Sequence, residues 1–224
     1  MDSIRTLYIG NRNYSSWSLR AWLALRFMAI DFRVERIPLD TPEFAARIRA
    51  ISAAARVPVL QDGASTVWDS LAIGEYGAEL AAAEQGPPGW PADAALRAHA
   101  RCAVAEMHSG FQALRNALPM NIRALRTVEL DDPVQRDIDR LAGLWCEALT
   151  LHDGRGPWLY GERSIADAFF APVLLRFRTY GVPVPELCQP WLETLLGDTE
   201  LEAWCALALE ETEIVDADEA GEPR

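Results

Sequence analysis

Short apolar runs alternate with longer amphipathic stretches along the N-terminal third of the chain. Apolar runs of roughly four to eight residues are typical of strands, and longer stretches with one apolar face are typical of helices. Asp62-Gly63 separates two of the short runs and predicts a hairpin turn. The predicted order is strand, helix, strand, helix, strand, strand, helix, over residues 4–9, 15–28, 32–39, 42–51, 57–60, 65–68 and 70–82.

This order of elements is the thioredoxin-like arrangement, an α/β fold. Pro58 lies at the start of the predicted hairpin, where that fold places a cis proline. We therefore predict a thioredoxin-like domain of order βαβαββα over residues 1–82. The run Gly-Pro-Pro-Gly at 86–89 then interrupts all periodicity, so residues 83–91 are predicted to link two domains.

Beyond the linker the pattern is helical. One helix is predicted after Asp132 as its cap, with Pro133 at its first position. Its apolar face is formed at three- and four-residue steps by Val134, Ile138, Leu141, Trp145 and Leu149. Because no hairpin signal occurs in 92–209, an all-α domain is predicted over 92–211. The acidic residues 212–224 are predicted to be a mobile tail.

Composition narrows the class of protein. Half of the 224 residues are hydrophobic and 24% are charged, which is enough apolar material for a sizeable core. No apolar run approaches the roughly 18 residues of a membrane span, and the first residues lack the apolar stretch of a signal peptide. We therefore expect no membrane association and a cytoplasmic location. The net charge of −12 disfavours binding to nucleic acid or to anionic lipid.

The cysteines and histidines give no sign of a metal site. The four cysteines lie far apart and form no C-x-x-C pair, which favours free thiols over a disulfide framework. His99, His108 and His152 show no spacing typical of metal ligands. We therefore predict that the protein binds no metal ion.

Four segments carry a resemblance to a known family. They read NYSSWSLR at 13–20, RVPVL at 56–60, WDSLAI at 68–73 and SIADA at 164–168. Together they resemble the glutathione transferase superfamily, in particular a serine-type, zeta-like bacterial member. The resemblance spans nearly the whole chain. It implies a thioredoxin-like domain followed by a helical domain, glutathione as co-substrate, a small-molecule electrophile as partner, and a homodimer.

Glutathione chemistry needs an ionised thiol. A free thiol has a pKa of about 8.5, and lowering it below neutrality takes about two units, or ~2.7 kcal/mol. A helix that begins near Ser15 offers unpaired N–H groups, a partial positive charge and a hydroxyl donor. The resemblance assigns the catalytic hydroxyl to Ser15, with Ser16 as a glutathione contact and the alternative activator. Trp17 stands where the zeta-like pattern has a cysteine.

Other interpretations of these residues stay open. Serine is a common helix cap, so Ser15 and Ser16 can be purely structural. Other classes of the superfamily activate the thiol with a tyrosine at the end of the first strand, which makes Tyr8 and Tyr14 alternatives. Serine is the favoured activator.

The resemblance also implies a set of glutathione-binding residues. Val57, before the proline, would pair through its backbone with the cysteinyl part of glutathione. Asp69 would accept from the γ-glutamyl amine and Ser70 would donate to its carboxylate, although both also suit a helix start. Arg56 is a candidate for the glycyl carboxylate, and Gln112 corresponds to a residue that reaches toward glutathione in zeta-like members. A solvated surface position is the alternative for both.

The second substrate is less well defined. Tyr14, Trp17, Phe111 and Met120 are predicted to form an apolar pocket wall. The predicted function is a glutathione S-transferase whose thiolate attacks a small, largely apolar electrophile. A glutathione-dependent cis-trans isomerase of the maleylacetoacetate type and a non-catalytic glutathione-binding protein of the same fold are the alternatives.

Overall fold

The N-terminal part is an α/β unit whose elements follow the predicted order. The computed structural model describes residues 4–224. This part comprises β1 Thr6–Ile9, α1 Ser16–Phe27, β2 Arg33–Arg36, α2 Pro42–Ile51, β3 Val59–Asp62, β4 Ser65–Trp68 and α3 Ser70–Glu84. The predicted thioredoxin-like domain is thereby confirmed, and the Val57–Pro58 peptide bond is cis.

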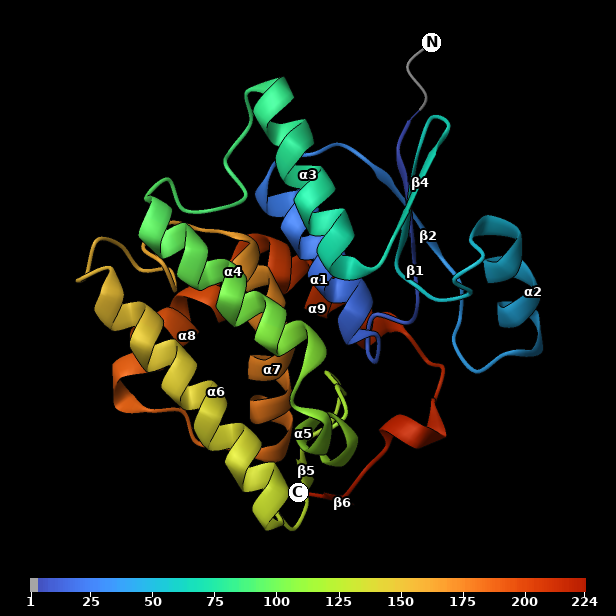
Figure 1. Ribbon diagram of the computed structural model, residues 1–224. Coiled ribbons are helices and arrows are strands. Elements are labelled where there is room, and N and C mark those ends of the chain that lie inside the picture. The colour runs from blue at the N-terminus through green and yellow to red at the C-terminus, as the bar shows by residue number, and fades with distance from the viewer. Residues whose placement is uncertain (1–3) are drawn as a thin grey trace.

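The four strands form one mixed sheet in the order β2-β1-β3-β4. β1 is parallel to β2 and antiparallel to β3, so that Leu7 lies opposite both Val34 and Leu60. Successive side chains of a strand point to opposite faces. Leu7 therefore packs in the core with α1 and α3, whereas Tyr8 packs with Ile48 of α2. Figure 1 shows α2 set apart from α1 and α3.

The remainder of the chain is largely helical. Its helices are α4 Ala94–Ser109, α5 Gln112–Ala117, α6 Asp132–Leu151, α7 Ile165–Tyr180, α8 Gln189–Leu196 and α9 Thr199–Glu210, with short turns η1 Glu186–Cys188 and η2 Asp216–Asp218. All residues of α7 except Arg178 are buried. This helix packs against α1 of the first part and α4 of the second, so it is the centre of the molecule (Figure 1).

The start of α6 differs slightly from the prediction. The cap is Asp131, whose Oδ1 accepts from the backbone N of Val134 at 3.0 Å. Asp132 is the first helical residue instead, because two consecutive aspartates are equivalent candidates for a cap. The predicted apolar face is buried at Val134, Ile138, Leu141 and Trp145, while Leu149 is half-buried.

One hydrophobic core runs through both parts of the chain. Its buried residues include Leu7 of the sheet and Trp145 of α6. The segment between α3 and α4 is packed as well, since Trp90 is only 7% exposed. A Cβ atom at Gly89 would lie 2.7 Å from the sulfur of Met28 and 2.9 Å from the Cβ of Ala78, so a larger residue here would force its neighbours to shift.

The C-terminal segment differs from the predicted mobile tail, because it returns to the helical part and ends beside β5 (Figure 1). Its β6 Glu222–Pro223 pairs with β5 Arg126–Thr127. Glu219 accepts hydrogen bonds from Tyr14 and Arg126. Glu219 thus pairs with one cation of the body, Arg126. The second part is therefore helical with a short β ladder, which is too short to leave an alternating pattern in the sequence.

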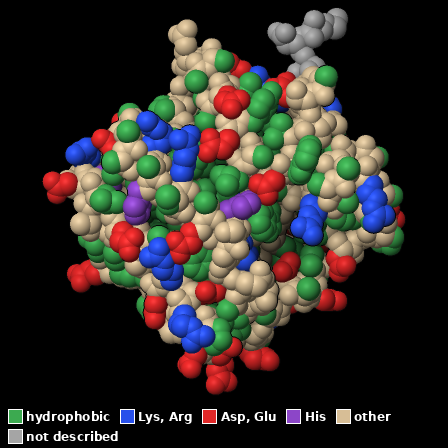
Figure 2. Space-filling view, viewed as in Figure 1, with side chains coloured by type: hydrophobic (Ala, Val, Ile, Leu, Met, Phe, Trp, Pro, Cys, Tyr) green, Lys and Arg blue, Asp and Glu red, His purple; other side chains and the backbone are tan. Residues whose placement is uncertain are grey.

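The surface carries charges of both signs. Figure 2 shows acidic and basic side chains interspersed over one face of the molecule. Among residues 4–224, no helix combines the length and the apolar character that a membrane span requires. Over the same residues, no three His, Cys, Asp or Glu side chains are grouped as a metal site would need.

Candidate active site

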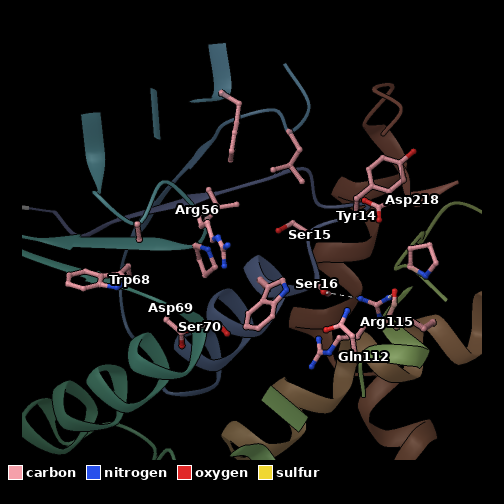
Figure 3. Close-up of a pocket in the computed structure, with 18 residues that line it drawn as sticks. Tyr14, Ser15, Ser16, Arg56, Trp68, Asp69, Ser70, Gln112, Arg115 and Asp218 are labelled. Atoms are coloured by element: carbon pink, nitrogen blue, oxygen red, sulfur yellow. Dashed lines mark hydrogen bonds between the residues drawn. The ribbon is translucent and has the colours of Figure 1, made fainter. Parts of the chain in front are cut away.

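A cleft of about 880 Å³ lies where the two parts of the chain meet. Its volume is within the range of small-molecule sites, roughly 300–1,000 Å³. Figure 3 shows the labelled side chains reaching it from α1, the loop before β3, the start of α3, α5 and the C-terminal segment. It brings together every residue predicted to activate or bind glutathione: Ser15, Ser16, Arg56, Val57, Asp69, Ser70 and Gln112.

Ser15 caps α1 and is 7% exposed. Its Oγ accepts from the backbone N of Ser18 at 3.4 Å and lies 2.7 Å from the Oγ of Ser18. The Ser18 Oγ also accepts from the backbone N of Gly10, at 3.0 Å. A hydroxyl has one proton, so when Ser18 donates to Ser15, the Ser15 proton is available to the cleft. The roles of helix cap and thiol donor are therefore compatible.

Ser16 occupies the first position of the same helix and is also buried. Its Oγ accepts from Nη2 of Arg176 at 3.1 Å, which ties the start of α1 to α7. The guanidinium uses one lone pair of the hydroxyl and leaves its proton available. Both serines are thus positioned to donate, and the assignment of catalysis to Ser15 stays a prediction.

The two tyrosines considered as thiol activators have other partners. Tyr8 lies on the sheet face that packs with α2, and its hydroxyl donates to Oε1 of Gln61 at 3.0 Å. Tyr14 lines the cleft, but its hydroxyl donates to Glu219 and accepts from Arg123. Burial and, next, the contact with Glu219 raise the pKa of Tyr14. Both tyrosine hydroxyls thus already donate to protein acceptors, and serine as the activator stays a prediction.

Asp69 and Ser70 begin α3. Asp69 has a φ of 76°, and its Oδ1 accepts from the backbone N of Leu71 at 2.8 Å. Burial works to raise the pKa of Asp69, but the contacts with His108 and the helix N–H groups lower it overall. Ser70 is fully buried, and its Oγ has no hydrogen-bond partner in the described part of the chain. Such a hydroxyl at a helix start suits a ligand carboxylate.

Val57, Arg56 and Gln112 supply further polar groups to the cleft. The strand pairing of β3 with β1 and β4 begins at Val59, so the backbone of Val57 lies outside the ladder. Arg56 is exposed, and Gln112 is exposed at the start of α5, where its Nε2 donates to Oδ1 of Asn116 at 2.7 Å. Their contacts with glutathione stay predictions.

The predicted apolar wall is only partly present. Tyr14 and Trp17 line the cleft. Phe111 and Met120 do not line it but belong to the hydrophobic core, where they are 8% and 1% exposed. Burying a large apolar side chain among helices stabilises the fold by about 1.5–3 kcal/mol. The sequence pattern cannot distinguish that burial from exposure to a cleft.

Two arginines that the sequence prediction missed also line the cleft, Arg115 of α5 and Arg176 of α7. The guanidinium of Arg115 lies 5.4 Å from the ring centre of Trp17, and its Nε donates to the carbonyl of Gly110 at 2.8 Å. Burial lowers the pKa of Arg115, and it lowers that of Arg176 to about 10, which leaves Arg176 charged at neutral pH. A charged residue within the apolar run of α7 is the signal that points to Arg176.

Arg20 adds a third guanidinium near these residues. It is fully buried, and among residues 4–224 its Nε, Nη1 and Nη2 find no hydrogen-bond partner. Instead it lies over the ring of Trp17 at 4.6 Å and over that of Phe169 at 5.6 Å. Burial lowers the pKa of Arg20 well below its usual value. Asp218 of the C-terminal segment completes the lining on the helical side.

Comparison with known proteins identifies relatives in sequence. The family model described as glutathione S-transferase, N-terminal domain, matches residues 14–80. A protein from Caenorhabditis elegans, described as a probable maleylacetoacetate isomerase, is 34% identical over 169 residues. The match covers 75% of this chain and 76% of that protein.

Solved structures share the fold. A glutathione transferase homologue from Burkholderia strain BGR1, with bound glutathione, has a TM-score of 0.72 and 25% identity over 93% of this chain and 100% of its own. The omega-class transferase 3C of Trametes versicolor has a TM-score of 0.69 and 17% identity over 96% and 92%. The relative in sequence, the family model and the shared architecture show that this chain belongs to the glutathione transferase superfamily.

Proposed function

We propose that the protein binds glutathione in this cleft, ionises its thiol at the start of α1 and adds the thiolate to an electrophilic carbon. The observation that carries the proposal is the meeting of Ser15 and Ser16 with Asp69 and Ser70 in one cleft. The Burkholderia homologue, which was crystallised with bound glutathione, supports glutathione as the thiol substrate. The proposal includes transferase and isomerase activity, since both begin with this step.

The polar groups of the cleft match the ends of glutathione. The γ-glutamyl amine binds Asp69, and the γ-glutamyl carboxylate binds the unpartnered hydroxyl of Ser70 at the start of α3. The backbone of Val57 pairs with the cysteinyl residue, which brings the sulfur toward Ser15. Arg56 holds the glycyl carboxylate. Holding the tripeptide at several points orients the sulfur before reaction.

The start of α1 lowers the thiol pKa by two effects. A hydroxyl donates a hydrogen bond to the sulfur, and the helix N-terminus contributes a partial positive charge. Together they supply the ~2.7 kcal/mol that two pKa units require. The thiol proton leaves to solvent, and the thiolate forms a bond to carbon. In a transferase a leaving group departs with its electron pair; in an isomerase the sulfur adds to a double bond and is expelled after rotation.

The two arginines of the cleft change the expected charge of the electrophile. Arg115 and Arg176 line the cleft. Asp137 acts electrostatically on Arg115 and Asp218 on Arg176, but neither guanidinium forms an ion pair with a carboxylate in the described chain. A substrate with an anionic group could pair with a guanidinium while its apolar part lies against Trp17. This arrangement favours an anionic electrophile over a largely apolar one. It also makes isomerisation the second candidate, because the relative from Caenorhabditis elegans is named for a carboxylate substrate.

Serine-to-alanine variants test thiol activation. Titration of the thiolate absorbance of bound glutathione gives its pKa in the wild type, Ser15→Ala, Ser16→Ala and the double variant. We expect a pKa below neutrality in the wild type and a rise of about one to two units in Ser15→Ala, because one hydrogen bond to the thiolate is lost. Ser109→Ala is the control, because this exposed serine donates to the carbonyl of Ala105.

An unchanged thiol pKa in a double variant that still binds glutathione would exclude serine activation. Binding without ionisation in the wild type would instead support the non-catalytic alternative. Product analysis then separates the two catalytic candidates, because an isomerase returns free glutathione and a transferase consumes it. The homodimer and the cytoplasmic location stay predictions; light scattering tests the first.

A further inference from the structure

We propose that His108 is a positioning residue for the γ-glutamyl end of glutathione, acting through Asp69. The inference rests on the proposed function, since it assumes that Asp69 receives the γ-glutamyl amine. His108 lies in the last turn of α4, in the helical part, whereas Asp69 begins α3 in the α/β part. Nε2 of His108 lies 3.2 Å from Oδ2 of Asp69, so the contact joins the two parts at the cleft.

The two oxygens of Asp69 have different roles. Oδ1 accepts from the backbone N–H groups of Leu71 and Ala72, at 2.8 and 3.4 Å, and thereby caps α3. Oδ2 faces His108. An N–H donor on Oδ2 fixes the rotation of the carboxylate and leaves a lone pair for a second donor. The side chain of Asp69 is 40% exposed and lines the cleft, so an incoming ammonium can reach that lone pair.

The ring of His108 is held by aromatic neighbours. It packs edge-to-face against Trp17 of α1, with ring centres 5.0 Å apart at 82°, and at 6.3 Å from Phe169 of α7. Nδ1 is buried and has no hydrogen-bond partner among the described residues. Nε2 is therefore the ring nitrogen placed to donate, and its acceptor is Asp69.

His108 is not among the residues that line the cleft in the described chain. It therefore acts on glutathione through Asp69 and makes no contribution to the reacting atoms. Loss of the donor should weaken glutathione binding about tenfold, the usual size for one hydrogen bond to a charged group, and leave kcat unchanged. KM for glutathione rises while kcat stays constant.

Two substitutions separate this role from simple packing. His108→Phe keeps the aromatic contact with Trp17 and loses the donor, whereas His108→Gln keeps an N–H donor and loses the ring. We expect about tenfold weaker glutathione binding in His108→Phe and near wild-type binding in His108→Gln. The opposite pattern, with Phe tolerated and Gln damaging, would show that the ring only supports Trp17 and would overturn the inference.

His99→Phe is the matched control, because His99 lies on the same helix. Its Nδ1 lies 2.8 Å from the hydroxyl of Tyr160, and it does not line the cleft among the residues described. We expect wild-type glutathione affinity in this variant. A tenfold loss there would mean that any change in α4 disturbs the site, which would count against a specific role for His108.

A glutathione analogue tests whether His108 affects binding of the γ-glutamyl amine. Calorimetry compares glutathione with glutaryl-cysteinylglycine, which is glutathione without its γ-glutamyl amino group. We expect the wild type and His108→Gln to prefer glutathione by about tenfold, and His108→Phe to bind both ligands alike. The ratio of the two affinities does not depend on the folded fraction of a variant.

These measurements distinguish failure of the role of His108 from failure of the proposed function. If the wild type prefers glutathione and His108→Phe keeps that preference, the role of His108 is wrong and the proposed function stands. If the wild type binds both ligands alike, the γ-glutamyl role of Asp69 fails, and the role of His108 fails with it. If the wild type binds neither ligand, the proposed function itself fails.

Discussion

Ser15, Ser16 and Trp17 share the first turn of α1, yet each side chain has a different partner. Ser15 contacts Ser18 within the helix, Ser16 accepts from Arg176 of α7, and Trp17 packs against guanidinium groups. Successive residues of a helix point in directions about 100° apart. One turn of helix therefore carries the proposed thiol donor, a contact with the helical part and an aromatic ring that lines the cleft.

Substitution of Arg115 tests the proposed charge of the electrophile. We expect Arg115→Met to lower kcat/KM about tenfold or more for an electrophile with a carboxylate, because a charge-assisted hydrogen bond is lost. A neutral electrophile of similar size should be little affected. Steady-state kinetics with such a pair of substrates measures the difference.

Two variants accompany this measurement. Arg115→Lys keeps the charge and should retain a preference for the anionic substrate. Arg140→Met is the control, because exposed Arg140 pairs with Glu106 and lies outside the lining of the cleft. An equal loss for both substrates in Arg115→Met would show that Arg115 supports the fold near Gly110 and not the substrate.

At the scale of elements, the C-terminal segment connects the start of the chain to the helical part. Glu219 holds this segment to the rest of the molecule through several hydrogen bonds. Its Oε1 accepts from the hydroxyl of Tyr14 and, at 2.9 Å, from Nδ2 of Asn121. Oε2 accepts from Arg126 beside the β5–β6 ladder. The packed segment places Asp218 at the cleft, so its order affects the shape of the site.

Removal of the Glu219 carboxylate should release this segment. We expect Glu219→Ala to lower the free energy of unfolding by about 1–3 kcal/mol, because buried donors lose their acceptor. Hydrogen exchange should become fast over residues 212–224. Glu222→Ala is the control, since Glu222 is exposed. Equally fast exchange of this segment in the wild type would support the mobile tail predicted from the sequence.

At the scale of the whole molecule, the shared core couples the two parts. The buried cluster that contains Leu7 of β1 also contains Trp145 of α6 and Trp191 of α8. Neither part buries its apolar surface alone, because α7 packs against α1 as well as against α4. The glutathione transferase architecture is thus one cooperative body with a cleft at the junction.

This arrangement predicts a single unfolding transition. Denaturant titration followed by circular dichroism and by tryptophan fluorescence should give coincident curves, as expected when both parts unfold together. The two signals can be compared in the wild type, because they report on different regions. Most buried tryptophans lie in the helical part, whereas circular dichroism reports on both parts. Two separated transitions would show that the parts are stable independently.

Local patterns explain what could be predicted. The strands and helices of the first part follow from periodicities of two and of three to four residues, which depend only on neighbouring positions. The segment SIADA at 164–168 is local as well, since the backbone N of Ser164 donates to the carboxylate of Asp167, three residues along the chain, at 2.9 Å. Phe111 and Met120 were misplaced because a local pattern shows that a side chain is apolar, not what it faces.

By itself, the sequence determined the order of elements, the family and the group of residues at the start of α1, before β3 and at the start of α3, because these features lie within short segments. Tertiary structure alone decided that Arg115, Arg176 and Asp218 enter the cleft, that His108 meets Asp69, and that the acidic C-terminal segment is packed. These contacts join residues distant in the chain, and their free energy depends on burial and charge pairing, which no local pattern records.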